Sequence, residues 1–285
     1  VGFDGRGYQT GIAESADLIH WEGRRLLIGR GAPGTFREHN FAMTCLLQEP
    51  ALENGGALMR QHGRFLGTYH AYPEPGYEVG PASIGFCWSE NLVDWEIEAP
   101  CFFAHEAAAW ERGGLYKSCL LRHGGMFYLF YNAKNGIPGN HREQIGLATS
   151  PDLKRWTRCR ESPVVANGGA GSADEIFAAD PAVYAYAGGW IMAYYGLAAD
   201  GHARALIAWS DDLLHWSKFP NPIRGVGPPG HYDSQHAHKS GLIVHGGRLH
   251  HFYCAVAPEP SGRIGTITTS ERRVIAVAAS ALPFA

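Results

Sequence analysis

The sequence predicts an all-β protein: a five-bladed β-propeller with four-stranded antiparallel blades. Three observations support this prediction: a seven-residue motif that occurs four times, short alternating apolar runs before each copy, and glycine-containing turns between those runs. A long helix is not expected anywhere in the chain. Since 285 residues are long for an average domain but ordinary for one closed β architecture, residues 1–285 are expected to form a single domain.

The repeated motif is S-x-[DN]-L-x-x-W. Ser and Asx side chains accept backbone N–H groups, so each copy predicts a tight turn after the third strand of a blade, with the Trp opening a fourth, outer strand. A fifth strand of the same kind, at 274–280, has no motif after it. The four copies occupy 15–21, 89–95, 150–156 and 210–216.

A hairpin precedes each third strand, with two apolar runs around an HG, HGG or AGG turn. The predicted hairpins are 56–72, 117–134, 181–197 and 240–256. The first blade is expected to be incomplete at the N-terminus. The opening VGFDG corresponds to the end of a second strand, and nothing before it corresponds to the innermost strand.

The composition excludes several classes of function. The net charge is −3 with no block of like charge, so neither a nucleic acid nor a membrane surface is an expected partner. Eight Trp and 12% aromatic residues suit a β core and also a carbohydrate site, where sugar faces stack on rings. The six Cys form no CxxC pair and no disulfide pattern, and no signal peptide is visible, which favours a cytoplasmic over a secreted location. The oligomeric state and the native N-terminus stay open.

The predicted topology gathers the functional residues on one face. Strands alternate in direction within a blade, so the start of the first strand and the loop between the second and third strands share a face around the axis. The histidine-rich segment 233–239 is one such strand start and is expected to point at the axis. The other starts are 110–117 and 174–181, and the loops are 4–9, 70–78, 132–144, 196–204 and 258–263.

This arrangement resembles the five-bladed propeller glycoside hydrolases of families 43, 32, 68, 117 and 130, with families 43 and 117 nearest. The resemblance covers essentially the whole chain. It rests on the repeated motif, on Asp180-Pro181 at the start of an inner strand, and on the strand ends FYNAK and AYYGL. It implies a glycosidase in which one protonated and one ionised group act across the scissile bond in an axial pocket.

The resemblance also implies roles for individual residues. Asp180 is the expected sugar-orienting carboxylate that tunes the acid. Glu111, Glu175, His236 and His238 compete as the acid, and Asp4 is the only early carboxylate on the correct face for the base. If the missing inner strand held the base, Asp4 would bind sugar hydroxyls instead.

The expected substrate-binding residues come from the same strand starts and loops. Lysines and Arg204 among them suit an acidic sugar or a phosphate. No cofactor is required, although a structural calcium ion at the axis is a candidate, held through water by a His such as His236. The expected set is His236, Asp233, Tyr72, Glu78, Tyr116, Lys117, Asn132, Lys134, Glu143 and Lys239.

The predicted activity is exo-hydrolysis of a terminal furanoside or pentoside, as in an arabinofuranosidase or xylosidase. A glycoside phosphorylase like family 130 and a non-catalytic carbohydrate-binding propeller are the alternatives. A transition-metal site at Asp233, His236 and His238 is less well supported than these two alternatives, because no Cys joins the three residues. The sugar, its anomer and the stereochemical outcome stay open.

Overall fold

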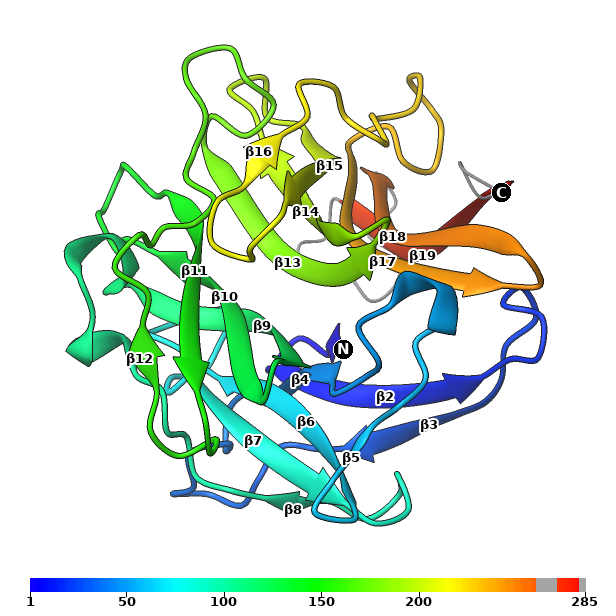
Figure 1. Cartoon of the computed structure of the whole chain (residues 1–285). Helices are drawn as coiled ribbons and strands as arrows, with labels where there is room; N and C mark the ends of the chain where they lie inside the picture. Colours follow the sequence, from blue (N-terminus) through cyan, green and yellow to red (C-terminus); the bar gives the residue numbers. More distant parts are fainter. Residues whose placement is uncertain (260–270, 282–285) are drawn as a thin grey trace.

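The computed structural model describes residues 1–259 and 271–281, and in this part the chain is all-β (Figure 1). Three short 3-10 turns interrupt the strands, at Leu52–Asn54, Ala104–Glu106 and Ala109–Glu111. None of the described helices is long and apolar enough to cross a membrane. Part of the loop expected at 258–263 lies outside the described residues.

Three sheets contain the described strands, and Figure 1 shows them set around a common centre. The first sheet has the order β1-β2-β3, formed by Gly2–Phe3, Tyr8–Glu14 and Glu22–Ile28. Its strand β1 pairs antiparallel with β2 through Phe3 and Tyr8. This places VGFDG next to a third strand, as the sequence predicted.

The second sheet corrects one predicted strand. The innermost strand is β4, Ala42–Leu46, which pairs with β6, Arg64–Ala71, whereas the predicted partner at 57–61 contributes only the two-residue β5, Arg60–Gln61. Between β4 and β5 the chain leaves the sheet in a short segment that contains Pro50, Gly55 and Gly56, residues that do not favour a continuous strand. β7, Ser83–Ser89, and β8, Glu96–Ile97, complete the sheet.

The third sheet holds three antiparallel groups in sequence order. β9 to β12 are Gly114–His123, Met126–Lys134, Glu143–Ser150 and Thr157–Arg158. β13 to β16 are Phe177–Tyr186, Gly189–Leu197, Ala203–Ser210 and Ser217–Lys218. β17 to β19 are His236–His245, Arg248–Pro258 and Glu271–Ala281. Short parallel pairings, Glu143 with Phe177 and Ala203 with His236, join the groups into eleven strands.

The repeated motif forms the predicted turn. Ser210 Oγ accepts the N–H groups of Asp212 and Leu213 at 3.2 and 2.9 Å. Asp212 Oδ1 accepts the N–H groups of Leu214 and His215. The motif leucine adopts a left-handed backbone in every copy, with φ of 63°, 64°, 64° and 68°. The motif is therefore scaffold, and the outer strands β8, β12 and β16 begin just after its Trp.

A second repeated feature fastens three of the inner strands. A buried tyrosine on the second strand of a group donates its hydroxyl to a carboxylate that precedes the inner strand, and a Lys or Arg side chain pairs with the same carboxylate. A buried, paired carboxylate of this kind is satisfied within the scaffold. The three sets are Tyr131, Glu111 and Arg158; Tyr194, Asp174 and Lys218; and Tyr253, Asp233 and Arg224.

Four inner strands, the three with a tyrosine set and β4, also contain a β-bulge. The pairing shifts register at Thr44 in β4, Lys117 in β9, Asp180 in β13 and Lys239 in β17. The last three residues adopt positive φ of 45°, 55° and 60°, which non-glycine residues rarely do. The bulges aim four different side chains at a shared cavity.

Candidate active site

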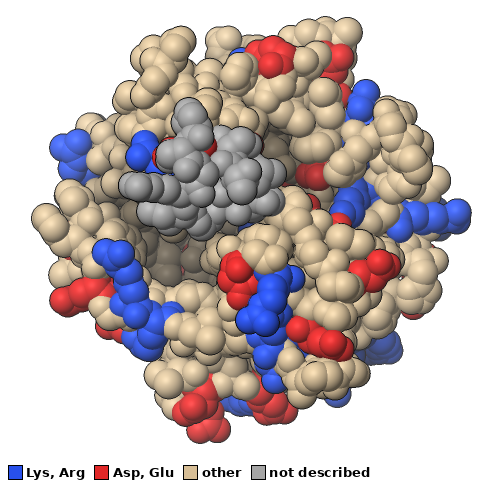
Figure 2. Space-filling model, turned by 180° about the vertical axis from the view of Figure 1, so that it is seen from behind, with Lys and Arg blue, Asp and Glu red and all other residues tan. Residues whose placement is uncertain are grey.

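Two adjoining cavities lie among the inner strands and their loops. The larger is about 370 Å³ and the smaller about 170 Å³, and Lys239 lines both. The larger one is bordered by the strand starts and loops, and the smaller by the bulges and the residues after them. Figure 2 shows one face of the molecule hollowed beside the residues drawn in grey, with positive and negative side chains interspersed around it. The larger cavity is lined by Tyr77, Glu78, Tyr116, His141, Glu143, Phe177, Tyr195, Leu197, Gly201, Ala203, His236, His238, Lys239 and Arg273.

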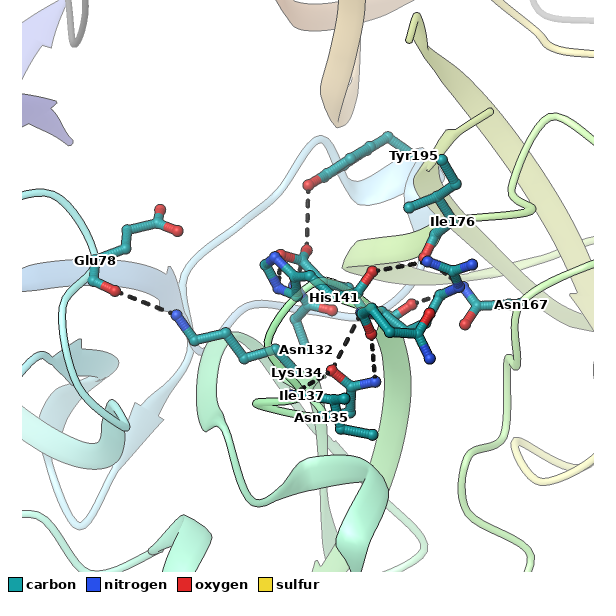
Figure 3. A network of polar contacts seen from close by, with 12 residues as sticks. Glu78, Asn132, Lys134, Asn135, Ile137, His141, Asn167, Ile176 and Tyr195 are labelled. Atoms are coloured by element: carbon teal, nitrogen blue, oxygen red, sulfur yellow. Dashed lines mark hydrogen bonds and ion pairs between the residues drawn. The ribbon is translucent and has the colours of Figure 1, made fainter. Parts of the chain in front are cut away.

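Glu143 is the most enclosed carboxylate of the larger cavity and begins β11. Its Oε2 accepts from Asn132 Nδ2 at 3.0 Å and from the Tyr195 hydroxyl at 3.4 Å, and His141 Nε2 lies 3.3 Å from Oε1. Figure 3 shows the Tyr195 side chain directed at this network. Burial alone would raise the pKa of Glu143, but the contacts from His141 and Asn132 hold it below its usual value. Glu143 is therefore an ionised carboxylate inside the cavity.

Glu78 is the second carboxylate of this cavity and comes from the loop after β6. Its Oε1 accepts from the Tyr8 hydroxyl at 3.0 Å, and Lys134 Nζ donates to its backbone oxygen at 3.3 Å (Figure 3). Burial raises the pKa of Tyr8 well above its usual value, and the nearby Glu78 adds to this effect, so the hydroxyl stays a donor. Glu78 has a φ of 56°, a strained conformation of the kind found at functional sites.

The two predicted histidines are neutral near neutral pH. Burial lowers the pKa of His236 to about 4 and that of His238 well below its usual value. His236 Nδ1 accepts the N–H of Ala203 at 3.0 Å, and His238 Nδ1 lies 3.1 Å from the carbonyl of Cys254. A neutral imidazole suits contacts with sugar hydroxyls better than proton donation to a leaving group.

Asp180 lies in the smaller cavity, at the bulge of β13. Its Oδ2 pairs with Lys239 Nζ at 2.8 Å, whereas its buried Oδ1 contacts no donor among the described residues. Although burial alone would lower the pKa of Lys239, Asp180 holds it above its usual value. The free oxygen of Asp180 points to a ligand hydroxyl, because buried acceptors are normally satisfied.

Other predicted binding residues surround the cavities. Lys134 Nζ lies 5.0 Å from the ring centre of Tyr72 and 5.5 Å from that of Tyr116. Both tyrosine hydroxyls are buried without a hydrogen-bond partner in the described part of the chain. Lys117 lines the smaller cavity. Asn132 does not line the larger cavity but donates a hydrogen bond to Glu143, which does.

Four predicted site residues lie elsewhere. Glu111 and Asp233 are the carboxylates of the tyrosine sets described above, held by Arg158 and Arg224. Asp4 is partly exposed, and its hydrogen bond with Arg30 holds its pKa well below the usual range. Glu175 accepts the backbone N–H of Gly171 at 2.8 Å. The segment 233–239 therefore divides into a scaffold carboxylate and cavity-lining residues from 236 onward.

Sequence reasoning missed three residues that line the larger cavity and one that hydrogen-bonds to its carboxylate Glu78. Tyr8 lies on β2 of the first sheet, Tyr195 follows the repeated tyrosine of β14, and Arg273 belongs to β19. His141 precedes β11 in the loop 132–144, which was predicted to lie on the functional face although His141 itself was not singled out. The repeat aligns strands but does not reveal which loop side chains turn inward.

The smaller cavity does not suit the axial calcium ion that the resemblance suggested. Its charged lining is Lys117, Lys239 and Asp180, and the one carboxylate already pairs with an ammonium. Among the described residues, no group of three or more His, Cys, Asp or Glu is placed to hold a metal ion, which also covers Asp233, His236 and His238.

Comparisons with solved structures agree with this fold. A structure described as a complex of BT0996 and RGII shares 29% identity, with a TM-score of 0.81 over 99% of this chain and 81% of that one. A structure described as a glycoside hydrolase shares 28% identity, with a TM-score of 0.80 over 98% and 80% of the two chains. A Bombyx mori GH32 beta-fructofuranosidase, BmSUC1, shares 19% identity, with a TM-score of 0.61 over 85% of this chain and 47% of that one. The last likeness concerns the fold alone.

The family comparison is more specific. No curated protein matches the sequence significantly. Residues 54–228, more than half of the chain, match the model of the glycosyl hydrolases family 32 N-terminal domain. The propeller glycosidase superfamily expected from the sequence is confirmed, and the matching family is 32 where families 43 and 117 were expected to be nearest. The chain therefore belongs to the glycosyl hydrolase family 32 N-terminal domain family and is a glycosidase.

Proposed function

We propose that this glycosidase is exo-acting and removes a terminal furanoside or pentoside from an oligosaccharide. The observation that carries the proposal is the cavity of about 370 Å³ with two carboxylates, Glu78 and Glu143. This volume accommodates about one or two sugar rings, which favours attack at a chain end. Two solved neighbours are complexes with carbohydrates, RGII and sucrose, and the second of them is a fructofuranosidase.

The environments of the two carboxylates suggest different roles. Glu143 is kept ionised by its hydrogen bonds, which suits a base or nucleophile. Glu78 stands in the loop after β6, where Tyr8 fixes Oε1. We assign to Glu78 the acid that gives its Oε2 proton to the leaving-group oxygen as the glycosidic bond breaks. Asp180 binds a sugar hydroxyl through its free oxygen, the orienting role expected from the sequence.

The proposal includes closure of the fold into a five-bladed propeller. The five antiparallel groups lie around one centre in Figure 1, and groups from all three sheets contribute to the larger cavity or its hydrogen bonds. Such a ring places all the inner-strand starts on one face. Small-angle scattering from the full chain would match the profile of a closed ring, whereas an open arc would give a larger radius of gyration.

The catalytic roles are tested with a panel of aryl furanosides and pyranosides. Glu143→Gln and Glu78→Gln are expected to lower kcat/KM by about 10²–10⁴-fold on the best substrate, because each removes a proton-transfer group or nucleophile. Glu90→Gln serves as the matched control, since Glu90 is an exposed carboxylate outside both cavities. Equal activity in all three variants would contradict the assignment.

A test of leaving groups separates the two roles. Loss of the acid matters least when the leaving group needs no proton, so Glu78→Gln should retain more activity on a dinitrophenyl glycoside than on an alkyl glycoside. Glu143→Gln should be equally impaired on both. The opposite pattern would exchange the two assignments.

A further inference from the structure

Lys117 lines the smaller cavity but has no carboxylate partner within ion-pairing distance among the described residues. Its backbone N–H donates to Nδ1 of the buried His70 at 3.4 Å, which anchors the residue at the bulge of β9. Burial lowers the pKa of Lys117 and the ammonium of Lys239 lowers it further, and the nearby Asp180 and Glu78 offset this only in part. An enclosed ammonium that forms no ion pair of its own is costly, so scaffold packing alone does not account for its position.

Hydroxyl groups line the cavity beside Lys117. The hydroxyls of Thr44 and Ser118 lie 3.3 Å apart and belong to a cluster with Thr68, and Ser240 contributes a further hydroxyl. The one carboxylate, Asp180, pairs with Lys239 through Oδ2 at 2.8 Å, and its free Oδ1 is left to accept a hydroxyl of the same ligand. The charged lining of this cavity therefore has a net charge of +1, which comes from Lys117.

The backbone is strained at the same place. Lys117, Asp180 and Lys239 all adopt positive φ, where a side chain with a Cβ is disfavoured by about 1 kcal/mol or more. A lysine on a regular strand would avoid this cost. The bulges hold two ammonium groups and several hydroxyls around one space of about 170 Å³, a volume that suits a small oxyanion.

We propose that the smaller cavity is an oxyanion subsite, in which Lys117, Lys239 and the hydroxyls of Thr44, Ser118 and Ser240 bind a carboxylate or phosphate group. The oxyanion belongs to an acidic sugar of the substrate or to free phosphate. Anion binding itself does not depend on the proposed exo-glycosidase activity; only the identity of the ligand as a substrate group rests on it. The +1 charge and the donor-rich lining select such a group over a neutral hydroxymethyl.

Calorimetry on the full chain tests the subsite. Inorganic phosphate and glucuronate are titrated into the parent protein, with xylose as the neutral probe. At least one anion is expected to bind at least tenfold more tightly to the parent than to Lys117→Met. Lys117→Arg, which keeps the charge, should recover part of the affinity, and Lys154→Met, an exposed lysine, should leave it unchanged. Circular dichroism verifies that each variant is folded.

The outcomes are distinct. Anion affinity that is equal in the parent and in folded Lys117→Met overturns the subsite, as does xylose binding that is as strong and as dependent on Lys117. Anion binding in a chain that hydrolyses no furanoside or pentoside keeps the subsite and contradicts the proposed activity. Turnover that requires phosphate and releases a sugar phosphate identifies phosphate as the occupant and supports the phosphorylase alternative, whereas glucuronate binding without phosphate binding identifies an acidic sugar.

Discussion

At the residue scale, the protonation of Glu143 depends on a few hydrogen-bond donors. An isolated carboxylate buried among Tyr116, Tyr195 and Phe177 would tend to stay protonated. His141 and Asn132 reverse this tendency by contacting one oxygen each. The proposed base is thus ionised before substrate arrives, which saves reorganisation during the reaction.

This gives a prediction for pH dependence. The folded-state pKa of Glu143 is depressed, so the ionised form persists above that pKa and is lost as the pH falls through it. His141→Ala removes the first of the contacts that lower the pKa, so the acidic limb of the kcat/KM profile should move to higher pH. His105→Ala, at an exposed histidine, should leave the limb in place. A profile unchanged by His141→Ala would mean that another group limits the rate in acid.

At the element scale, the motif turns fasten the third strand of a group to the outer one. Ser210 is buried and accepts two backbone N–H groups, whereas Ser15 makes the same contacts in a more exposed turn. Ser210→Ala is expected to lower the free energy of unfolding by about 1–3 kcal/mol, because two buried donors lose their acceptor. Ser15→Ala should cost clearly less, since water can replace the hydroxyl. Urea denaturation of both variants measures the difference, and equal losses would show that burial does not set the cost.

The same scale shows what sequence patterns can predict. The motif and the glycine turns predicted where the strands of the repeated groups begin and end, because a turn depends on local residues. The strand β4 was missed because a neighbouring run, 56–61, has the same apolar pattern and a better turn signal. Which of two such runs becomes the inner strand is decided by packing around the centre.

The prediction of the site residues had the same limits, because it also rested on local patterns. Asp180, Glu78, Glu143, His236, His238 and Lys239 were placed at the cavities because they lie at strand starts and loops of one face. Glu111 and Asp233 share that position in the repeat but belong to the tyrosine sets. Both stand six residues before a bulge residue, as does Asp174. A carboxylate repeated at one offset in three groups indicates scaffold, and this signal was present in the sequence.

At the scale of the whole molecule, hydrogen bonding between the groups is uneven. The groups from β9 to β19 form one continuous sheet, whereas the first sheet has three strands and a largely exposed β3. Regions with few buried contacts open most easily. Amide hydrogen exchange should therefore be faster in 1–28 than in β10 and β14, and uniform protection across these segments would contradict this prediction. Since the Tyr8 hydroxyl donates to Glu78, opening of the first sheet would also disturb the proposed acid.

The bulges described in the inner strands have a consequence for how such an enzyme changes over time. One backbone device recurs four times but presents a threonine, two lysines and an aspartate, at 44, 117, 239 and 180. The strand pairing shifts register at each of these positions while the side chain differs, so we expect that one substitution there changes the chemistry of the smaller cavity and leaves the strand pairing as it is. New specificities can therefore arise by amino-acid substitution at these four positions, while the fold around them is kept.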